Sequence, residues 1–226
     1  MHKQSKINGH AAALRIANFD TDQVMPKQFL RGIDKSGLTE GLFYDLRFDE
    51  EGKPKPEFFL NQPAYATTDV LIAGSNYGCG SSREHAVWGM QQFGFKAVIA
   101  SSFAEIFYSN AMGNGLLLVV LPEDQVQALM KEVDENGAPI CVDIDIENLT
   151  VRTLKHEFKF TMSARHHRMF LEGLDVIGLT LKYKPQIDAF AQEHWKAQPW
   201  VKDVARRTID RSEEHTSELQ SLRHIS

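Results

Sequence analysis

The chain has few of the residues on which several protein classes depend. It has 226 residues but only two cysteines, Cys79 and Cys141, too few for a disulfide framework or for a metal site of four thiolates. No apolar run approaches the ~20 residues that a membrane-spanning helix needs. Residues 1–6 lack the apolar segment of a signal peptide. We therefore expect a soluble, cytoplasmic protein that has no membrane partner.

Positive charge is also scarce. The chain contains 25 Lys and Arg against 30 Asp and Glu, which gives a net charge of −5 at pH 7. Nucleic-acid binding depends on a basic surface, so we expect no nucleic-acid partner. Hydrophobic residues make up 42% of the chain, which is ordinary for a globular protein that buries a sizeable core.

The most informative segment is a glycine-rich run over 74–86, GSNYGCGSSREHA. It follows an apolar, strand-like run at 69–73 and precedes a stretch of helical spacing. Backbone N–H groups at a helix start, together with the helix dipole, favour an anion. Two serine hydroxyls and one guanidinium come to the same place, so the run predicts a site for a small carboxylate or phosphate ligand. The competing interpretation is a tight turn in which Ser81 or Ser82 merely caps the helix.

The order of the expected elements indicates an α/β fold. Apolar strands alternate with helices over 69–121, which predicts a parallel βαβαβ unit with right-handed crossovers. Alternating segments after residue 139 predict an antiparallel meander. The expected strands are 11–17, 69–73, 96–100, 116–121, 140–146, 150–154 and 156–161, and the expected helices are 26–30, 84–93, 103–112, 123–135, 164–172 and 187–196.

Two stretches are expected to lie outside the regular elements. Residues 34–63 are polar and rich in Gly and Pro, which predicts a long surface excursion. Residues 209–226 are expected to form a disordered tail after a single domain over 1–208. Within the tail, the last 16 residues, 211–226, resemble the translation of a common sequencing adapter, so we interpret them as an artefact.

A family resemblance is carried by four segments, which are, in order along the chain, NFDTDQVMPKQFL (18–30), NYGCGSSREH (76–85), SSFAEIFYSN (101–110) and GLDVIGLTL (173–181). Together they reach almost from the start of the chain to about residue 200, and the chain resembles the small subunits of 3-isopropylmalate dehydratase, an aconitase-like enzyme of leucine biosynthesis. The resemblance implies a swivel-type layered β/β/α domain with a barrel-like mixed sheet.

The resemblance also implies a chemistry. Members of this family act as hydro-lyases that interconvert 2-isopropylmalate and 3-isopropylmalate, which are small dicarboxylic hydroxy acids, through 2-isopropylmaleate. The partner is a large subunit that holds a four-iron four-sulfur cluster, and no cofactor or metal is expected on this chain. By the motif match, Ser81 abstracts the proton, while Ser82 and Arg83 bind a substrate carboxylate.

The same resemblance places a substrate-selecting loop at Phe29, Leu30 and Arg31. The apolar pair suits an isopropyl group and Arg31 a carboxylate, although Phe29 and Leu30 are equally expected as helix-end core. Two other functions stay open: a small subunit of a related hydro-lyase acting on homoaconitate, citraconate or dimethylmaleate, and a non-catalytic binding module with the same fold.

The remaining candidates have a structural interpretation beside the functional one. Asp20 and Asp22 form a possible metal pair, but we expect a loop bordering the site. Cys79 is expected to be a small loop residue rather than a nucleophile. His85 is expected to pack or cap its helix, and the pair at 166–167 to lie on a solvated helix face.

Overall fold

The computed structural model describes residues 3–30 and 37–209. The chain divides into two compact units, Met1–Val176 and Ile177–Ser226. The single domain expected over 1–208 stays a prediction. The expected tail lies outside the described residues from 210 onward.

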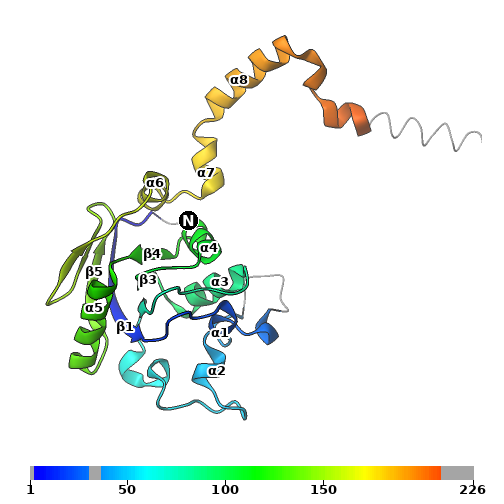
Figure 1. The fold of residues 1–226 in the computed structure, drawn as a ribbon. Helices are drawn as coiled ribbons and strands as arrows, with labels where there is room; N and C mark the ends of the chain where they lie inside the picture. The colour runs from blue at the N-terminus through cyan, green and yellow to red at the C-terminus, as the bar shows by residue number, and fades with distance from the viewer. Residues whose placement is uncertain (1–2, 31–36, 210–226) are drawn as a thin grey trace, which may run out of the picture. The chain divides into compact units, whose positions relative to one another are not determined.

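The first unit is built on one mixed sheet of seven strands in the order β4-β3-β2-β1-β5-β6-β7 (Figure 1). β1 is the turning point of the sheet, because it pairs in parallel with β2 and antiparallel with β5. The strands are β1 Lys6–Leu14, β2 Val70–Ala73, β3 Ala97–Ala100, β4 Leu117–Val120, β5 Ile140–Asp145, β6 Thr150–Arg152 and β7 Glu157–Lys159.

The helices are short in the first 65 residues and longer thereafter. Single 3₁₀ turns occur at Lys27–Phe29, Phe59–Asn61, Pro63–Tyr65 and Pro199–Val201. The α-helices are α1 Thr21–Val24, α2 Tyr44–Arg47, α3 Glu84–Phe93, α4 Glu105–Asn114, α5 Glu123–Asn136, α6 Ala164–Glu172, α7 Val176–Leu181 and α8 Lys184–Ala197.

The predicted α/β class and the parallel βαβαβ unit are confirmed. β2, β3 and β4 pair in parallel, and α3 and α4 connect them on one face of the sheet while α5 lies on the other (Figure 1). Every residue of β2 and β3 is buried, as expected of parallel strands that are covered on both faces. The antiparallel meander β5-β6-β7 is also confirmed.

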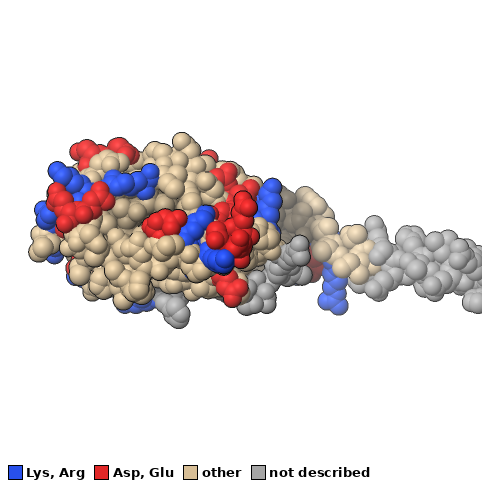
Figure 2. Space-filling view, turned by 90° about the horizontal axis from the view of Figure 1, so that it is seen from below, with Lys and Arg blue, Asp and Glu red and all other residues tan. Residues whose placement is uncertain are grey.

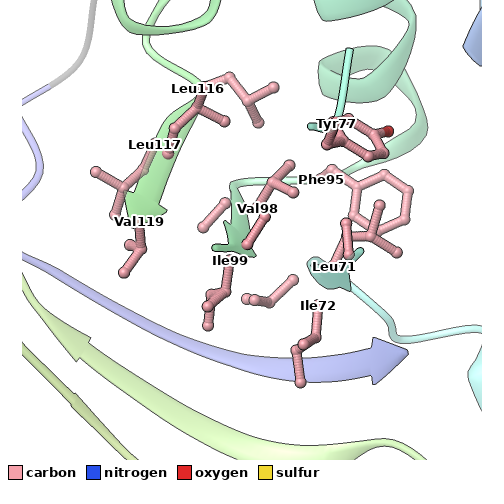
Figure 3. Close-up of a cluster of buried hydrophobic side chains, with 14 of the residues drawn as sticks. Leu71, Ile72, Tyr77, Phe95, Val98, Ile99, Leu116, Leu117 and Val119 are labelled. Atoms are coloured by element: carbon pink, nitrogen blue, oxygen red, sulfur yellow. The ribbon is translucent and has the colours of Figure 1, made fainter. Parts of the chain in front are cut away.

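The core of this unit lies where the parallel strands meet the helices. Leu71 and Val98 are partners on β2 and β3 and point to the same side of the sheet as Phe95 and Tyr77, whereas Ile99 points to the other side (Figure 3). All five side chains are buried. Since burial contributes roughly 25 cal/mol per Å² of apolar surface, this cluster fixes the strand ends that carry the glycine-rich run.

Two predicted boundaries are wrong for identifiable reasons. The strand expected at 11–17 instead occupies Lys6–Leu14. Exposed polar residues alternate with buried ones in its first half, and this half is held in the sheet by its pairing with β5. The helix expected to start at Phe103 starts at Glu105, because Phe103 forms a parallel bridge with Tyr77 instead. Long-range pairing of this kind leaves no local periodicity.

The long excursion is less irregular than the sequence indicates. Residues 37–63 contain α2, the whole 3₁₀ turn Phe59–Asn61 and the first residue of the turn Pro63–Tyr65, while 34–36 lie outside the described residues. Leu42 and Phe43 are fully buried, so this segment contributes to the core. Phe43 N–H donates to the Val24 carbonyl at 2.9 Å, which ties the excursion to the end of α1.

Charges of both signs share the surface. On the face in Figure 2, acidic and basic side chains lie next to one another among uncharged residues. Surface ion pairs such as Lys155–Glu135, at 2.6 Å, contribute about 0–1 kcal/mol each. The packed sheet therefore dominates stability.

Within 3–30 and 37–209, no helix is long and apolar enough to cross a membrane.

Replacing Ile99 by Ala tests the central role of β3. Ile99 is fully buried, so we expect the substitution to lower the free energy of unfolding by about 2–5 kcal/mol through lost burial and a residual cavity. The matched control is Ile106→Ala on α4, whose side chain is 53% exposed and should cost less than about 0.5 kcal/mol beyond helix propensity. Urea unfolding measures both. Equal losses would contradict this assignment of the core.

Candidate active site

The glycine-rich run forms the loop between β2 and α3, above the carboxyl end of the parallel strands. Gly78 and Gly80 adopt left-handed φ angles of 78° and 88°, which favour glycine. A Cβ at Gly80 would lie 2.5 Å from Asp20 Oδ2, a distance that real Cβ atoms do not reach. The loop can therefore approach the segment before α1 only because residue 80 has no side chain.

Backbone hydrogen bonds join this loop to the segment around α1. Gly78 N–H donates to the Phe19 carbonyl at 2.8 Å, and Thr21 N–H donates to the Cys79 carbonyl at 2.8 Å. The Thr21 hydroxyl donates to the Ser81 carbonyl at 2.8 Å. Two segments about sixty residues apart in the chain thus form one continuous surface that fixes the backbone of Ser81.

Arg83 connects the serine to a carboxylate. Its Nη1 forms an ion pair with Asp22 Oδ1, and its Nη2 donates to Ser81 Oγ at 3.3 Å. The Arg83 side chain is only 17% exposed. A guanidinium beside a hydroxyl oxygen favours the deprotonated form of that hydroxyl, so the arrangement stabilises a Ser81 alkoxide, the form that can accept a proton.

The capping interpretation of the serines is wrong. α3 begins at Glu84 and its N-cap is Arg83, in an extended conformation with no side-chain cap bond. Ser81 and Ser82 are both exposed. Because neither hydroxyl caps the helix, both are available to a ligand beside a helix N-terminus whose dipole favours negative charge.

Asp20 and Asp22 have separate structural partners. Asp20 caps α1 by accepting from Asp22 N–H at 2.6 Å, and its own N–H donates to Gln23 Oε1 at 3.0 Å, which together form a capping box. Asp22 pairs with Arg83. Across the ranges 3–30 and 37–209, no group of three or more His, Cys, Asp or Glu side chains is arranged to hold a metal ion.

A third segment supports the loop from the other side. Asn76 has a left-handed φ of 55°. Its backbone N–H donates to Ser102 Oγ at 2.8 Å, and its side-chain amide donates to Asn18 Oδ1 at 2.8 Å. Next to it, Tyr77 stacks on Phe19 with ring centroids 5.6 Å apart. Burial raises the pKa of Tyr77 well above its ordinary value, so this phenol stays neutral within the core.

Three of the four resemblance segments therefore converge. Residues 18–30, 76–85 and 101–110 meet around the loop, whereas 173–181 crosses the boundary between the two units. The pairing of Asp22 with Arg83 was not predicted from the sequence. The only sequence signal for this pair was an acidic residue in one matching segment and a basic residue in another. Residues about sixty positions apart form no local pattern, so the sequence did not indicate that the two side chains meet.

The other candidates have packing roles. The Phe29 ring lies 5.0 Å from the Tyr44 ring, and both Phe29 and Leu30 are partly buried against the core. Their selection of substrate stays a prediction, and Arg31 lies outside the described residues. The Cys79 thiol donates to the Asn18 carbonyl at 3.2 Å. The His85 ring lies against the Trp88 ring at 4.9 Å.

The pair at 166–167 also faces protein groups. His167 Nε2 lies 2.8 Å from the Ile146 carbonyl. His166 is half-buried beside Tyr108, with ring centroids 5.7 Å apart, and burial together with Arg165 lowers the pKa of His166. The expectation of a fully solvated helix face is therefore wrong for these two side chains.

This architecture has known relatives. The family model described as the aconitase C-terminal domain matches residues 1–124, so the class is that of the aconitase swivel domains. The solved 3-isopropylmalate dehydratase (LeuD) structure from Methanocaldococcus jannaschii is similar, with a TM-score of 0.57 and 28% identity over 82% of this chain and 99% of that chain.

Curated relatives narrow the class further. The chain is 56% identical over 209 residues to 3-isopropylmalate dehydratase small subunit 1 of Chromobacterium violaceum, covering 92% of this chain and 97% of that protein. It is 47% identical over 202 residues to the small subunit of Phenylobacterium zucineum, covering 89% of this chain and 98% of that protein. The chain belongs to the 3-isopropylmalate dehydratase small-subunit family.

Replacing Asp22 by Asn tests whether this carboxylate positions Arg83. The substitution keeps the side-chain size but removes the charge, and hydrogen bonds to charged groups contribute ~1.5–3 kcal/mol. We expect kcat/KM of the enzyme assembled with its large subunit to fall by about 10-fold to 100-fold, with partial rescue by Asp22→Glu. Steady-state kinetics measures the fall, and a melting curve separates it from unfolding.

The control is Asp134→Asn, which removes the carboxylate that pairs with the exposed Arg15. This variant should keep the parent kcat/KM. If Asp22→Asn also keeps it, the ion pair has no part in the reaction.

Proposed function

We propose that this chain is the small subunit of a 3-isopropylmalate dehydratase of leucine biosynthesis. The enzyme interconverts 2-isopropylmalate and 3-isopropylmalate through 2-isopropylmaleate. The observation that carries the proposal is 56% identity over 209 residues to a small subunit of that name, spanning 97% of its length. The exposed hydroxyls of Ser81 and Ser82 beside the largely buried Arg83 side chain support a catalytic rather than a purely binding role.

The proposal includes a large subunit as partner, as the name of the relatives implies. We place a four-iron four-sulfur cluster on that partner, because the described residues of this chain do not fit one: Cys79 and Cys141 are single thiols and no ligand group surrounds them. When bound, such a cluster supplies a Lewis acid for the substrate hydroxyl. The residues of this chain supply the base and the groups that bind a carboxylate.

The dehydration needs a base for a proton on the carbon next to a carboxylate. We assign that base to the Ser81 oxygen. A serine hydroxyl is a weak base in water, so the site has to stabilise its alkoxide. The Arg83 guanidinium donates to this oxygen at 3.3 Å, and the positive end of the α3 dipole adds to the same potential.

Arg83 has enough donors for two tasks. A guanidinium carries five N–H groups in a planar fork, and the contacts to Asp22 and Ser81 involve Nη1 and Nη2. We propose that the donors beyond these contacts bind a substrate carboxylate, with the exposed Ser82 hydroxyl as a further donor. Arg83 would then orient the substrate next to the oxygen that it activates.

Replacing Ser81 by Ala tests the assigned base. The variant should still assemble and bind substrate, because the hydroxyl is exposed and its backbone carbonyl keeps the Thr21 bond. Loss of a positioned base costs ~10²–10⁴-fold, which should appear in kcat. The decisive measurement is exchange of the α-proton of bound substrate with solvent. Exchange at the parent rate would assign the base elsewhere.

Two neighbouring variants act as comparisons. Ser82→Ala removes one neutral hydrogen bond, worth about 0.5–1.5 kcal/mol, and should reduce turnover far less than Ser81→Ala. Arg83→Lys keeps the charge but loses the fork, so both substrate binding and turnover should weaken, by roughly 10²-fold for a contact made in the transition state.

Substrate choice is assigned to Phe29, Leu30 and Arg31. An apolar pocket separates alkyl groups by only ~1–3 kcal/mol per methylene, whereas a new cation recruits a carboxylate. Leu30→Arg should therefore weaken turnover of isopropylmalate and favour a substrate with an additional carboxylate. The ratio of kcat/KM for the two substrate types measures the shift, and an unchanged ratio would exclude Leu30 from the site.

A further inference from the structure

A hydrogen bond joins the start of α3 to the end of α4, next to the candidate active site. Glu84 is the first residue of α3 and directly follows Arg83. Asn114 is the last residue of α4, and its Nδ2 donates to Glu84 Oε1 at 2.5 Å. The two residues are 30 positions apart in the chain, so only the fold brings them together. This contact has no part in the chemistry assigned above to Ser81 and Ser82.

Asn114 is itself held in one orientation by its neighbours. Its Oδ1 accepts from Trp88 Nε1 at 3.1 Å, and its Nδ2 also donates to the Asn110 carbonyl at 2.9 Å. The backbone carbonyl of Asn114 accepts from Gln91 Nε2 at 2.9 Å. Because both ends of the side-chain amide have partners, the amide presents an N–H group to Glu84 in a fixed direction and restrains the carboxylate.

Glu84 places a negative charge where the site has to attract one. The N-terminus of a helix attracts carboxylates, and a guanidinium pairs with them through its planar fork. An unrestrained Glu84 carboxylate is therefore attracted to the same N–H groups that would bind a substrate carboxylate. Since Glu84 belongs to the same chain, its effective concentration at these donors is high, and it would compete strongly with a dissolved substrate.

The restraint is important because burial does not confine Glu84. The residue is exposed, and a long side chain in water samples several rotamers. Within the described residues, Arg83 forms its ion pair with Asp22 and not with the neighbouring Glu84. The hydrogen bond from Asn114 accounts for this choice of partner, since it directs the Glu84 carboxylate towards α4.

We infer that Asn114 is a positioning residue, which keeps the Glu84 carboxylate away from Arg83 and so leaves the guanidinium donors to a substrate carboxylate. This inference rests on the proposed function, in which Arg83 binds substrate. Asn114 does not touch substrate and acts only through Glu84. A neutral amide is suited to this task, because it restrains the carboxylate without adding a second positive charge that would attract the substrate away from Arg83.

A role in bracing the two helices predicts a different result. Glu84→Ala and Asn114→Ala break the same hydrogen bond, so both would loosen α3 against α4 if the bond served only as a brace. Only Asn114→Ala leaves an unrestrained carboxylate next to Arg83. The two single variants therefore separate the control of a charge from bracing, and the double variant shows whether Glu84 causes the defect of Asn114→Ala.

The test measures KM and kcat for 3-isopropylmalate with each variant assembled with its large subunit. We expect Asn114→Ala to raise KM by about 10-fold, at the lower end of what a hydrogen bond to a charged group contributes. Its kcat should change by less than about 2-fold, because loss of substrate binding in the ground state raises KM alone. Glu84→Ala and the double variant should both keep the parent KM.

Two further variants guard against a general effect on folding. Asn114→Asp keeps an acceptor for Trp88 Nε1 but cannot donate to Glu84, so it should raise KM as Asn114→Ala does. The matched control is Asn136→Ala, because Asn136 is the last residue of α5 and its amide donates to the Ala138 carbonyl at 3.1 Å. This control should keep the parent KM and kcat. Melting curves confirm that each variant is folded.

The outcomes separate this inference from the proposed function. If Asn114→Ala keeps the parent KM, or if the double variant keeps the raised KM, the inference is overturned and the proposed function stands.

A crystal structure of the assembled Asn114→Ala enzyme supplies a measurement that needs no turnover. The Glu84 carboxylate should lie within hydrogen-bond distance of Arg83 or of the first N–H groups of α3, and a carboxylate that stays beside α4 would overturn the inference. If the parent turns over no isopropylmalate, the proposed function fails, and the position of Glu84 in this crystal structure decides the inference.

Discussion

The site depends on the contact between the α1 segment and the glycine-rich loop, which we call the latch. Thr21 donates two hydrogen bonds to the loop, one from its backbone N–H and one from its hydroxyl. Gly80 permits this approach because it has no Cβ, which would collide with Asp20. The ion pair between Asp22 and Arg83 then closes the same junction. Without this latch, Ser81 would lie on an unsupported surface loop, since it neither caps α3 nor enters the core.

The sheet explains why these two segments meet. β1 and β2 are parallel neighbours, so the residues that follow them emerge at the same edge. α1 follows β1, and the glycine loop follows β2. β3 lies beside β2, and the segment after it brings Ser102 to Asn76. The ends of three adjacent strands thus supply the latch, the loop and the support of the loop. The carboxyl ends of parallel strands are the usual location of ligand sites in α/β sheets.

Much of this was predictable from local patterns and some was not. The strands of the βαβαβ unit and α3 follow from apolar runs, helical spacing and a C-capping glycine at Gly94, all of which are properties of neighbouring residues. The start of β1, the displacement of Phe103 and the pairing of Asp22 with Arg83 depend on contacts between distant segments. The three candidate residues of the loop were identified from its composition and resemblance, but the residue that holds Arg83 became apparent only from the fold.

The exposure of Ser81 limits how far Arg83 can stabilise charge on its oxygen. A guanidinium next to an oxygen in contact with bulk water stabilises negative charge weakly, because the high dielectric constant of water screens the interaction. Covering the loop with a second protein would exclude water and strengthen the same contact without moving Arg83.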